Sequence, residues 1–216
     1  MIDIVAIHLP KTGGSSFYEI LKKVYGEQKV VRYTKGKYKK VIDAGKTLED
    51  DLGSKVSVIQ GHLGYTDVKE IIKKNQSKVI IWMRNPIERV ISNYTWWEFK
   101  TRTNPNHPEK HRINETLEVY ITRKETQNKM YKALKGLKLK DVYFIGFLEN
   151  FENDMTELAS KLNWPLIHHS HEKNSKNFDS VKPKVNDELR KKIARLNGRD
   201  IKLYEKAKQV CQNTKI

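Results

Sequence analysis

The chain has 216 residues, of which 42 are Lys or Arg and 26 are Asp or Glu, so its formal net charge is +16. This length favours one domain over residues 1–216 and excludes a multidomain assembly, while a hydrophobic fraction of 38% excludes wholesale disorder. The basic excess indicates an anionic partner: a nucleic acid, a membrane surface, a polyanionic sugar or a phosphorylated small molecule.

The compartment is indicated by what the sequence lacks. It has one cysteine, Cys211, which excludes a scaffold held by intramolecular disulfides. The N-terminal residues lack the basic segment and cleavage site of a secretion signal, and no stretch reaches the roughly 20 apolar residues of a membrane span. We therefore expect a soluble, cytoplasmic protein without a membrane span. No feature indicates an oligomeric state.

Short apolar runs that favour strands alternate along the chain with segments of helical periodicity. The predicted strands cover residues 2–8, 56–60, 78–83 and 142–147. The predicted helices cover residues 17–24, 67–74 with Asp67 as the cap, 87–100, 114–134, 151–162 and 186–216 with a break at Asn197-Gly198. This alternation predicts right-handed βαβ units. We therefore expect an α/β fold, P-loop-like with three α/β/α layers and a central, mostly parallel sheet of about five strands.

In such sheets ligands bind beyond the carboxyl ends of the strands. The first predicted strand is followed by the loop Pro10-Lys-Thr-Gly-Gly-Ser-Ser16. Its two glycines allow the backbone to approach an anion, Ser15 or Ser16 can cap the next helix, and the helix-start amides with Lys11 form a phosphate cradle. An ordinary strand-to-helix turn is the alternative. The loop is not a Walker A loop, because Lys11 precedes both glycines, so no Mg²⁺ ligand is needed.

A second candidate segment follows the predicted strand 78–83. Arg84 stands at the end of the strand, Pro86 suits the first position of the next helix, and Ser92 lies about two turns along that helix. Arg84 can form paired bonds to a phosphate, and Ser92 can donate another. The alternative is that Arg84 pairs with a carboxylate and that Ser92 only fills a helix face.

Together these two segments, Pro10 to Phe17 and Arg84 to Tyr94, resemble the signature segments of sulfotransferases that use 3′-phosphoadenosine 5′-phosphosulfate (PAPS). The resemblance is strongest to the carbohydrate branch related to heparan sulfate and uronyl 2-O-sulfotransferases, and it extends loosely over residues 4–208. It implies transfer of the sulfuryl group from PAPS to an acceptor hydroxyl, favouring a carbohydrate, with PAP as the product and no metal. It also implies binding of the 5′-phosphosulfate by Lys11, Thr12, Gly13, Gly14, Ser15 and Ser16 and of the 3′-phosphate by Arg84 and Ser92.

The segment Gln60-Gly-His62 resembles the part of the family that carries the catalytic base, and this implies that role for His62. His62 follows the predicted strand 56–60, and a histidine near its ordinary pKa of about 6.5 suits proton abstraction at neutral pH. A structural histidine is the alternative. The 2-O-sulfotransferases have a second histidine where this chain has Gln60, so a two-histidine mechanism does not carry over. In the implied in-line transfer His62 takes the hydroxyl proton and Lys11 stabilises the leaving phosphate.

Four further features have alternative readings. The basic stretch 29–46 either binds an anionic acceptor or is a solvated face. Trp96, Trp97 and Phe99 either stack on adenine or a sugar, or pack in the core. His168, His169 and His171 either bind a metal or lie in a polar loop, and the loop is favoured because their spacing matches no standard zinc pattern. Residues 170–184 either close over the nucleotide or form a solvated loop.

Two other functions compete with sulfuryl transfer. A non-catalytic protein that binds a polyanion or nucleic acid is the main alternative, but the stacking motifs of RNA-binding domains are missing and the basic excess is not confined to one tract. We therefore expect no nucleic-acid partner. A nucleotide kinase or ATPase is disfavoured because the Walker A order is absent.

Overall fold

The computed structural model describes residues 1–53, 55–165 and 183–213. Within them the chain forms one sheet of five strands in the order β2-β3-β1-β4-β5, and every neighbouring pair is parallel. The carboxyl ends of all five therefore meet at one edge. The predicted α/β fold is confirmed, with a wholly parallel sheet. The strands are β1 (Ile4–Ile7), β2 (Val30–Tyr33), β3 (Val58–Gly61), β4 (Lys78–Met83) and β5 (Phe144–Phe147).

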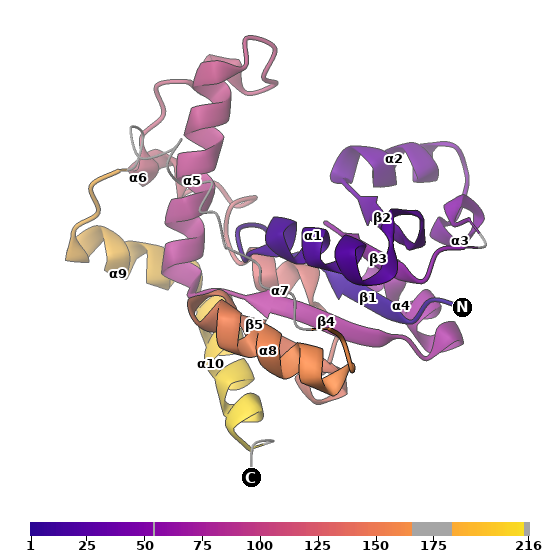
Figure 1. The fold of residues 1–216 in the computed structure, drawn as a ribbon. Helices are drawn as coiled ribbons and strands as arrows, with labels where there is room; N and C mark the ends of the chain where they lie inside the picture. Colours follow the sequence, from indigo (N-terminus) through magenta and orange to yellow (C-terminus); the bar gives the residue numbers. More distant parts are fainter. Residues whose placement is uncertain (54, 166–182, 214–216) are drawn as a thin grey trace.

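Helices connect the strands and cover the sheet (Figure 1). The α-helices are α1 (Gly14–Tyr25), α2 (Lys35–Asp43), α3 (Leu48–Asp51), α4 (Tyr65–Asn75), α5 (Pro86–Thr103), α6 (Leu117–Tyr120), α7 (Lys129–Ala133), α8 (Phe151–Lys161), α9 (Asp187–Leu196) and α10 (Gly198–Asn213). Short 3-10 turns are η1 (Glu27–Lys29), η2 (Lys110–Arg112), η3 (Leu139–Asp141) and η4 (Leu148–Asn150).

The sheet is the middle of three layers, because successive side chains of each strand point to opposite faces. Ile4, Ala6 and Ile80 pack under α1 and α8 on one face. Val5 and Ile81 alternate with them and pack on the other face, where α4, α7 and α10 supply the partners. The predicted three-layer arrangement is confirmed.

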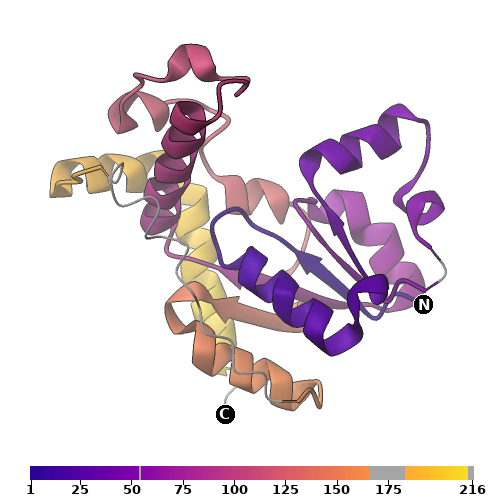
Figure 2. The same ribbon diagram turned by 45° about the horizontal axis from the view of Figure 1, so that its top comes forward.

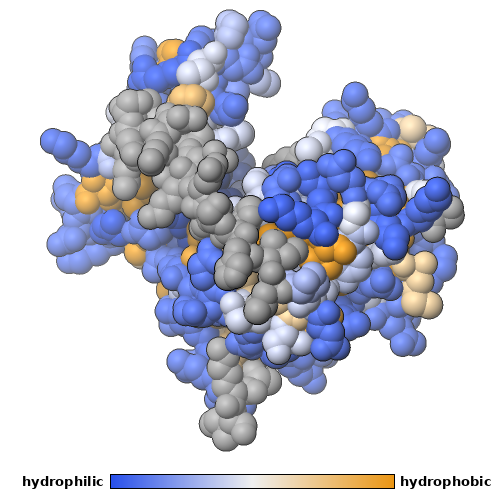
Figure 3. Space-filling model, in the orientation of Figure 1, coloured by the Kyte–Doolittle hydropathy of each residue, from blue (hydrophilic) through white to orange (hydrophobic). Residues whose placement is uncertain are grey.

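Helix α5 leaves the end of β4 and extends away from the sheet, with α6 and α9 beside it (Figure 2). A third apolar cluster joins these helices, and Trp97 lies buried within it. At the base of α5 the fully buried Arg89 lies 3.6 Å from Asp200 of α10, which also accepts the backbone N–H of Tyr131. The surface is hollowed between the part that carries α5 and the part that carries α1 and α2 (Figure 3).

The observed elements correct the predicted ones at three places. Residues 114–134 do not form one helix: α6 and α7 are separated by turns, and Asn128 before α7 has a left-handed φ of 50°. The strand β2 was not predicted. Helix α4 begins at Tyr65, so Asp67 is not its cap, although its carboxylate accepts the N–H of Gly64 at 2.7 Å. The predicted break at Asn197-Gly198 is confirmed.

Candidate functional site

The loop after β1 turns into α1 earlier than the sequence predicts. Gly13 has a left-handed φ of 86° and starts the helix, so Ser15 and Ser16 fall inside its first turn and no side chain caps it. The prediction that Ser15 or Ser16 caps this helix is therefore wrong. The first amides of an α-helix have no partner within the helix, and here no side-chain cap serves them, which suits an anion-binding helix start.

Both glycines of this loop are required, Gly13 chiefly by its left-handed backbone and Gly14 by close packing. A Cβ on Gly13 would lie 2.9 Å from Leu148 Cδ1, and the left-handed backbone would be strained as well. A Cβ on Gly14 would lie 2.0 Å from the ring of His8, the residue that follows β1. The buried Thr12 hydroxyl donates to the carbonyl of Leu9 at 2.8 Å, so the loop lies tight against the end of β1.

Lys11 and Arg84 bring the two sequence motifs together. Arg84 Nη1 donates to the backbone carbonyl of Lys11 at 3.3 Å, across a sequence separation of 73 residues. Burial and the charge of Arg84 lower the pKa of Lys11 to about 8, and burial also lowers the pKa of Arg84. Lys11 also has a left-handed φ of 68°. Two partly buried cations are thus held side by side at the carboxyl edge of the sheet.

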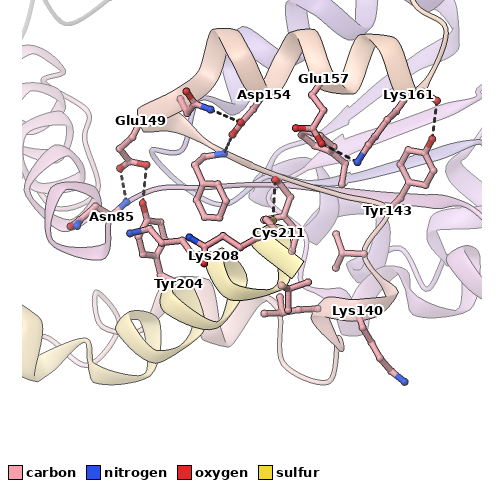
Figure 4. A pocket seen from close by; sticks show the side chains of 18 residues that line it. Asn85, Lys140, Tyr143, Glu149, Asp154, Glu157, Lys161, Tyr204, Lys208 and Cys211 are labelled. Atoms are coloured by element: carbon pink, nitrogen blue, oxygen red, sulfur yellow. Dashed lines mark hydrogen bonds and ion pairs between the residues drawn. The ribbon is translucent and has the colours of Figure 1, made fainter. Parts of the chain in front are cut away.

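The turn that carries Arg84 is fixed from the side of β5. Glu149 accepts the backbone N–H of Asn85 at 2.7 Å and the hydroxyl of Tyr204 at 3.1 Å (Figure 4). The Asn85 side chain caps α5 by accepting the N–H of Ile87, and Pro86 occupies the first turn as predicted. A cavity of about 730 Å³ between β5, α8 and α10 reaches Asn85 from this side.

Ser92 lies on α5 two turns beyond the Arg84 turn and is half-buried. Unlike Lys11, it makes no hydrogen bond within the described residues that would join it to Arg84. The structure therefore brings Lys11 and Arg84 into contact but does not link Ser92 to either.

His62 follows β3 at the same edge and stacks on His8. The ring centroids are 4.1 Å apart with an interplanar angle of 22°, and His62 Nδ1 lies 3.1 Å from the carbonyl oxygen of His8. If Nδ1 carries the proton and donates it to this carbonyl, Nε2 keeps the lone pair that a base needs. Burial, followed by the charges of His62, Arg32 and Lys11, lowers the pKa of His8 to about 2, so His8 stays neutral.

Three residues near the loop were not predicted to contact it. His8 directly follows β1, which is a signal that could have found it. Arg32 of β2 donates to Ser15 Oγ at 3.3 Å and lies over the ring of Tyr18, but β2 itself was not predicted. The buried Gln60 donates to the carbonyl of Gly14 at 2.9 Å.

The remaining candidates, the tryptophans after Ser92 and the basic stretch 29–46, differ in their burial. Trp97 belongs to the core of the α5 region, whereas Trp96 is 40% exposed and its ring centroid lies 5.9 Å from Lys11 Nζ. The basic stretch 29–46 forms η1, β2 and α2. Among the basic residues of this stretch whose burial the structure describes, the exposed ones are Lys29, Lys37, Lys39, Lys40 and Lys46.

The three clustered histidines 168, 169 and 171, and most of the stretch 170–184, lie outside the described residues. In the part of the chain that the structure describes, no three His, Cys, Asp or Glu side chains are grouped so as to hold a metal ion. None of the helices described there combines the length and apolar character needed to cross a membrane.

Known proteins resemble the chain over most of its length. The model of the sulfotransferase family matches residues 2–207. The fold is similar to that of mouse sulfotransferase SULT7A1 complexed with PAP, with 21% identity, a TM-score of 0.46, and coverage of 90% of this chain and 62% of that one. It is also similar to retinol dehydratase in complex with androsterone and the inactive cofactor PAP, with 13% identity, a TM-score of 0.35, and coverage of 92% and 65%. The chain thus spans less than two thirds of either protein. A search of curated proteins found no match.

Proposed function

The chain belongs to the sulfotransferase family, as its motifs predict, and from this premise we propose that it transfers a sulfuryl group from PAPS to an acceptor hydroxyl and releases PAP. The favoured acceptor is a carbohydrate. This choice rests on the resemblance of Pro10 to Phe17 and Arg84 to Tyr94 to the carbohydrate branch.

The observation that carries the proposal is the contact between Lys11 and Arg84. Burial destabilises both charges, and the charge of Arg84 adds to the cost at Lys11, whereas Glu149 and Glu88 offset only part of the cost at Arg84. An anion bound at this place would relieve the remaining cost of both charges. An anionic donor with phosphates at two positions fits this arrangement, because the first-turn amides of α1 adjoin Lys11 while Arg84 stands at the end of the neighbouring strand.

The donor roles divide between the two loops. Lys11, Thr12 and the α1 start from Gly13 to Ser16 would hold the 5′-phosphosulfate, and Arg84 with Ser92 would hold the 3′-phosphate. When bound, PAPS supplies the sulfuryl group that moves to the acceptor oxygen. Lys11 stabilises the negative charge that gathers on the 5′-phosphate side. No metal is required for these roles.

His62 serves as the general base in this proposal. Its Nδ1 is positioned to donate to the His8 carbonyl, which leaves Nε2 to accept the proton of the acceptor hydroxyl. The acceptor oxygen gains a bond to sulfur as the bond from sulfur to the phosphate oxygen breaks, and the proton goes to His62. An anionic acceptor is favoured by the exposed lysines of residues 29–46, since β2 lies beside β3.

Thermal unfolding with adenosine 3′,5′-bisphosphate, ATP and AMP tests the donor site. We expect the bisphosphate alone to raise the unfolding temperature, since it alone carries the 3′-phosphate that Arg84 would bind. Equal shifts with all three nucleotides would contradict the assignment. A screen with ³⁵S-labelled PAPS across neutral and acidic glycans, glycolipids and phenols then identifies the acceptor class, and transfer to phenols alone would overturn the carbohydrate proposal.

A further inference from the structure

The sheet register brings two imidazole rings together at the site. Ile7 of β1 pairs with Gly61 of β3, so the next residue of each strand, His8 and His62, emerges side by side. The backbone N–H of His8 donates to the carbonyl of Gly61 at 2.7 Å, so the hydrogen bonding between β1 and β3 continues up to the two histidines. The rings then stack at 4.1 Å between centroids.

The His8 ring also packs against the donor loop, which we define as residues 11–16. The His8 ring lies so close to Gly14 that a Cβ there would be 2.2 Å from Nε2 and 2.0 Å from Cδ2. His8 is only 9% exposed, and its Nδ1 has no hydrogen-bond partner among the residues that the structure describes. Packing against Gly14 and His62, with the backbone ladder, therefore holds this ring.

His8 does not compete with His62 for a proton. The pKa of His8 is lowered to about 2 by burial first, and then by the charge that a protonated His62 would carry and the charges of Arg32 and Lys11. A neutral ring beside His62 offers its π face to the positive charge that would form on His62, whereas a second positive ring would oppose it.

We propose that His8 is a positioning residue that fixes the plane and the tautomer of His62 and sets the spacing between His62 and the donor loop. The stack holds the His62 ring where Nδ1 faces the His8 carbonyl. Without the stack the ring loses one contact that opposes rotation about its Cβ–Cγ bond, and the hydrogen bond that selects the Nδ1–H tautomer is weakened. This role rests on the proposed function in one respect, that His62 is the base.

The tautomer is measurable without donor or acceptor. Long-range ¹H–¹⁵N spectra of protein labelled with ¹⁵N-histidine distinguish Nδ1–H from Nε2–H, and the loss of one signal in His62→Ala assigns His62 among the seven histidines. The spectra are taken near pH 8, where a histidine of ordinary pKa is neutral.

Two variants distinguish the effect of the planar His8 ring from the effect of the volume that it fills. His8→Leu removes the planar ring but fills most of the space, and His8→Phe keeps a planar ring without nitrogens. The matched control is Tyr25→Leu, which removes a ring at the opposite end of α1, where Tyr25 meets Trp164 edge to face at 5.8 Å.

We expect His62 to be mainly Nδ1–H in the wild type, in His8→Phe and in Tyr25→Leu. In His8→Leu the ratio of Nε2–H to Nδ1–H should rise by about threefold to tenfold, the factor that one hydrogen bond represents. A wild type in which His62 is mainly Nε2–H overturns the proposal whether or not any variant folds, and so does an unchanged ratio in His8→Leu.

Failure of this proposal and failure of the proposed function give different results. The tautomer reports on the histidine pair alone, whereas bisphosphate binding and ³⁵S transfer report on the sulfotransferase reaction. A His62 tautomer that depends on His8, in a protein that neither binds bisphosphate nor transfers sulfate, would support the pairing and reject the reaction.

Discussion

Two groups of basic side chains lie on this molecule, and their surroundings differ. Lys11 and Arg84 are partly buried at the carboxyl edge of the sheet, and burial lowers the pKa of both. The lysines of α2, such as Lys39 and Lys40, are exposed to solvent. An exposed charge is screened by water and salt, whereas a buried one gains strongly from a specific counter-charge. The positions of Lys11 and Arg84 therefore say more about anion binding than the net charge of +16 does.

The order of the strands sets the order of the buried group along the edge. Reading from β2 to β4, the strand ends present Arg32, then His62, then His8 with Lys11, then Arg84. Strand β3, which precedes the proposed base, thus lies between β2, which carries Arg32, and β1, which precedes the proposed donor loop, and Arg32 itself contacts that loop by donating to Ser15 Oγ at 3.3 Å. The sheet thus organises the first group, whereas the second group is spread over the surface of α2.

The largest expected effect comes from the centre of this edge. His62→Ala should lower the rate of ³⁵S transfer by about 100-fold to 10,000-fold, the contribution typical of a general base. Bisphosphate binding should stay near the wild-type value, because His62 is not assigned to the donor. The control is His111→Ala, an exposed histidine on η2. Retained transfer in His62→Ala would remove His62 as the base.

Arg84→Ala tests the donor side directly. Its affinity for adenosine 3′,5′-bisphosphate, measured by calorimetry, should fall by about 10-fold to 100-fold, since hydrogen bonds to charged groups contribute about 1.5–3 kcal/mol. Lys39→Ala, on the exposed helix, should change the affinity by less than about twofold. Equal losses of bisphosphate affinity in the two variants would contradict a difference in role between buried and exposed cations.

The pKa of Lys11 gives the site a pH dependence. With a pKa of about 8, Lys11 loses its proton as the pH rises through this value, and only the protonated amine attracts a phosphate. Bisphosphate affinity should therefore be full below pH 8 and fall by up to about tenfold per pH unit above it. Lys11→Arg should remove this fall, because arginine stays charged. A pH-independent affinity in the wild type would contradict the role of Lys11.

The smallest expected effect concerns the exposed group and the polyanion alternative. Lys39→Ala with Lys40→Ala should leave bisphosphate affinity within about twofold and lower the salt dependence of any binding to random DNA by about two charges. DNA binding that survives both Lys11→Ala and Arg84→Ala, without bisphosphate binding in the wild type, would favour the polyanion reading. Filter binding at several salt concentrations measures it.

Much of the fold follows from local pattern. The strand 78–83 matches β4 residue for residue, because a continuous apolar run is typical of a strand buried on both faces. Strand β2 was not predicted because its four residues lie within a lysine-rich stretch at the edge of the sheet. The single helix over 114–134 was wrong because its two ends pack in different places: Leu117, Tyr120 and Ile121 pack with α5, whereas Met130 and Leu134 pack on the sheet beside α10.

The site, too, could be predicted only in part from the sequence. Lys11, Arg84 and His62 could be predicted because each follows a strand and stands in a recognisable motif. Their contacts could not, since the pairing of β1 with β3 and of β1 with β4 is set by the strand order. The stacking of His8 on His62 depends on that pairing and on its register, so neither residue alone indicates it.

The contact of Glu149 with Asn85 and Tyr204 has a consequence for synthesis. A nascent chain that has emerged only as far as β5 contains both donor motifs, but lacks Glu149 and the α10 residue that hold the Arg84 turn from the far side. Donor binding should then mature late, after α10 has docked.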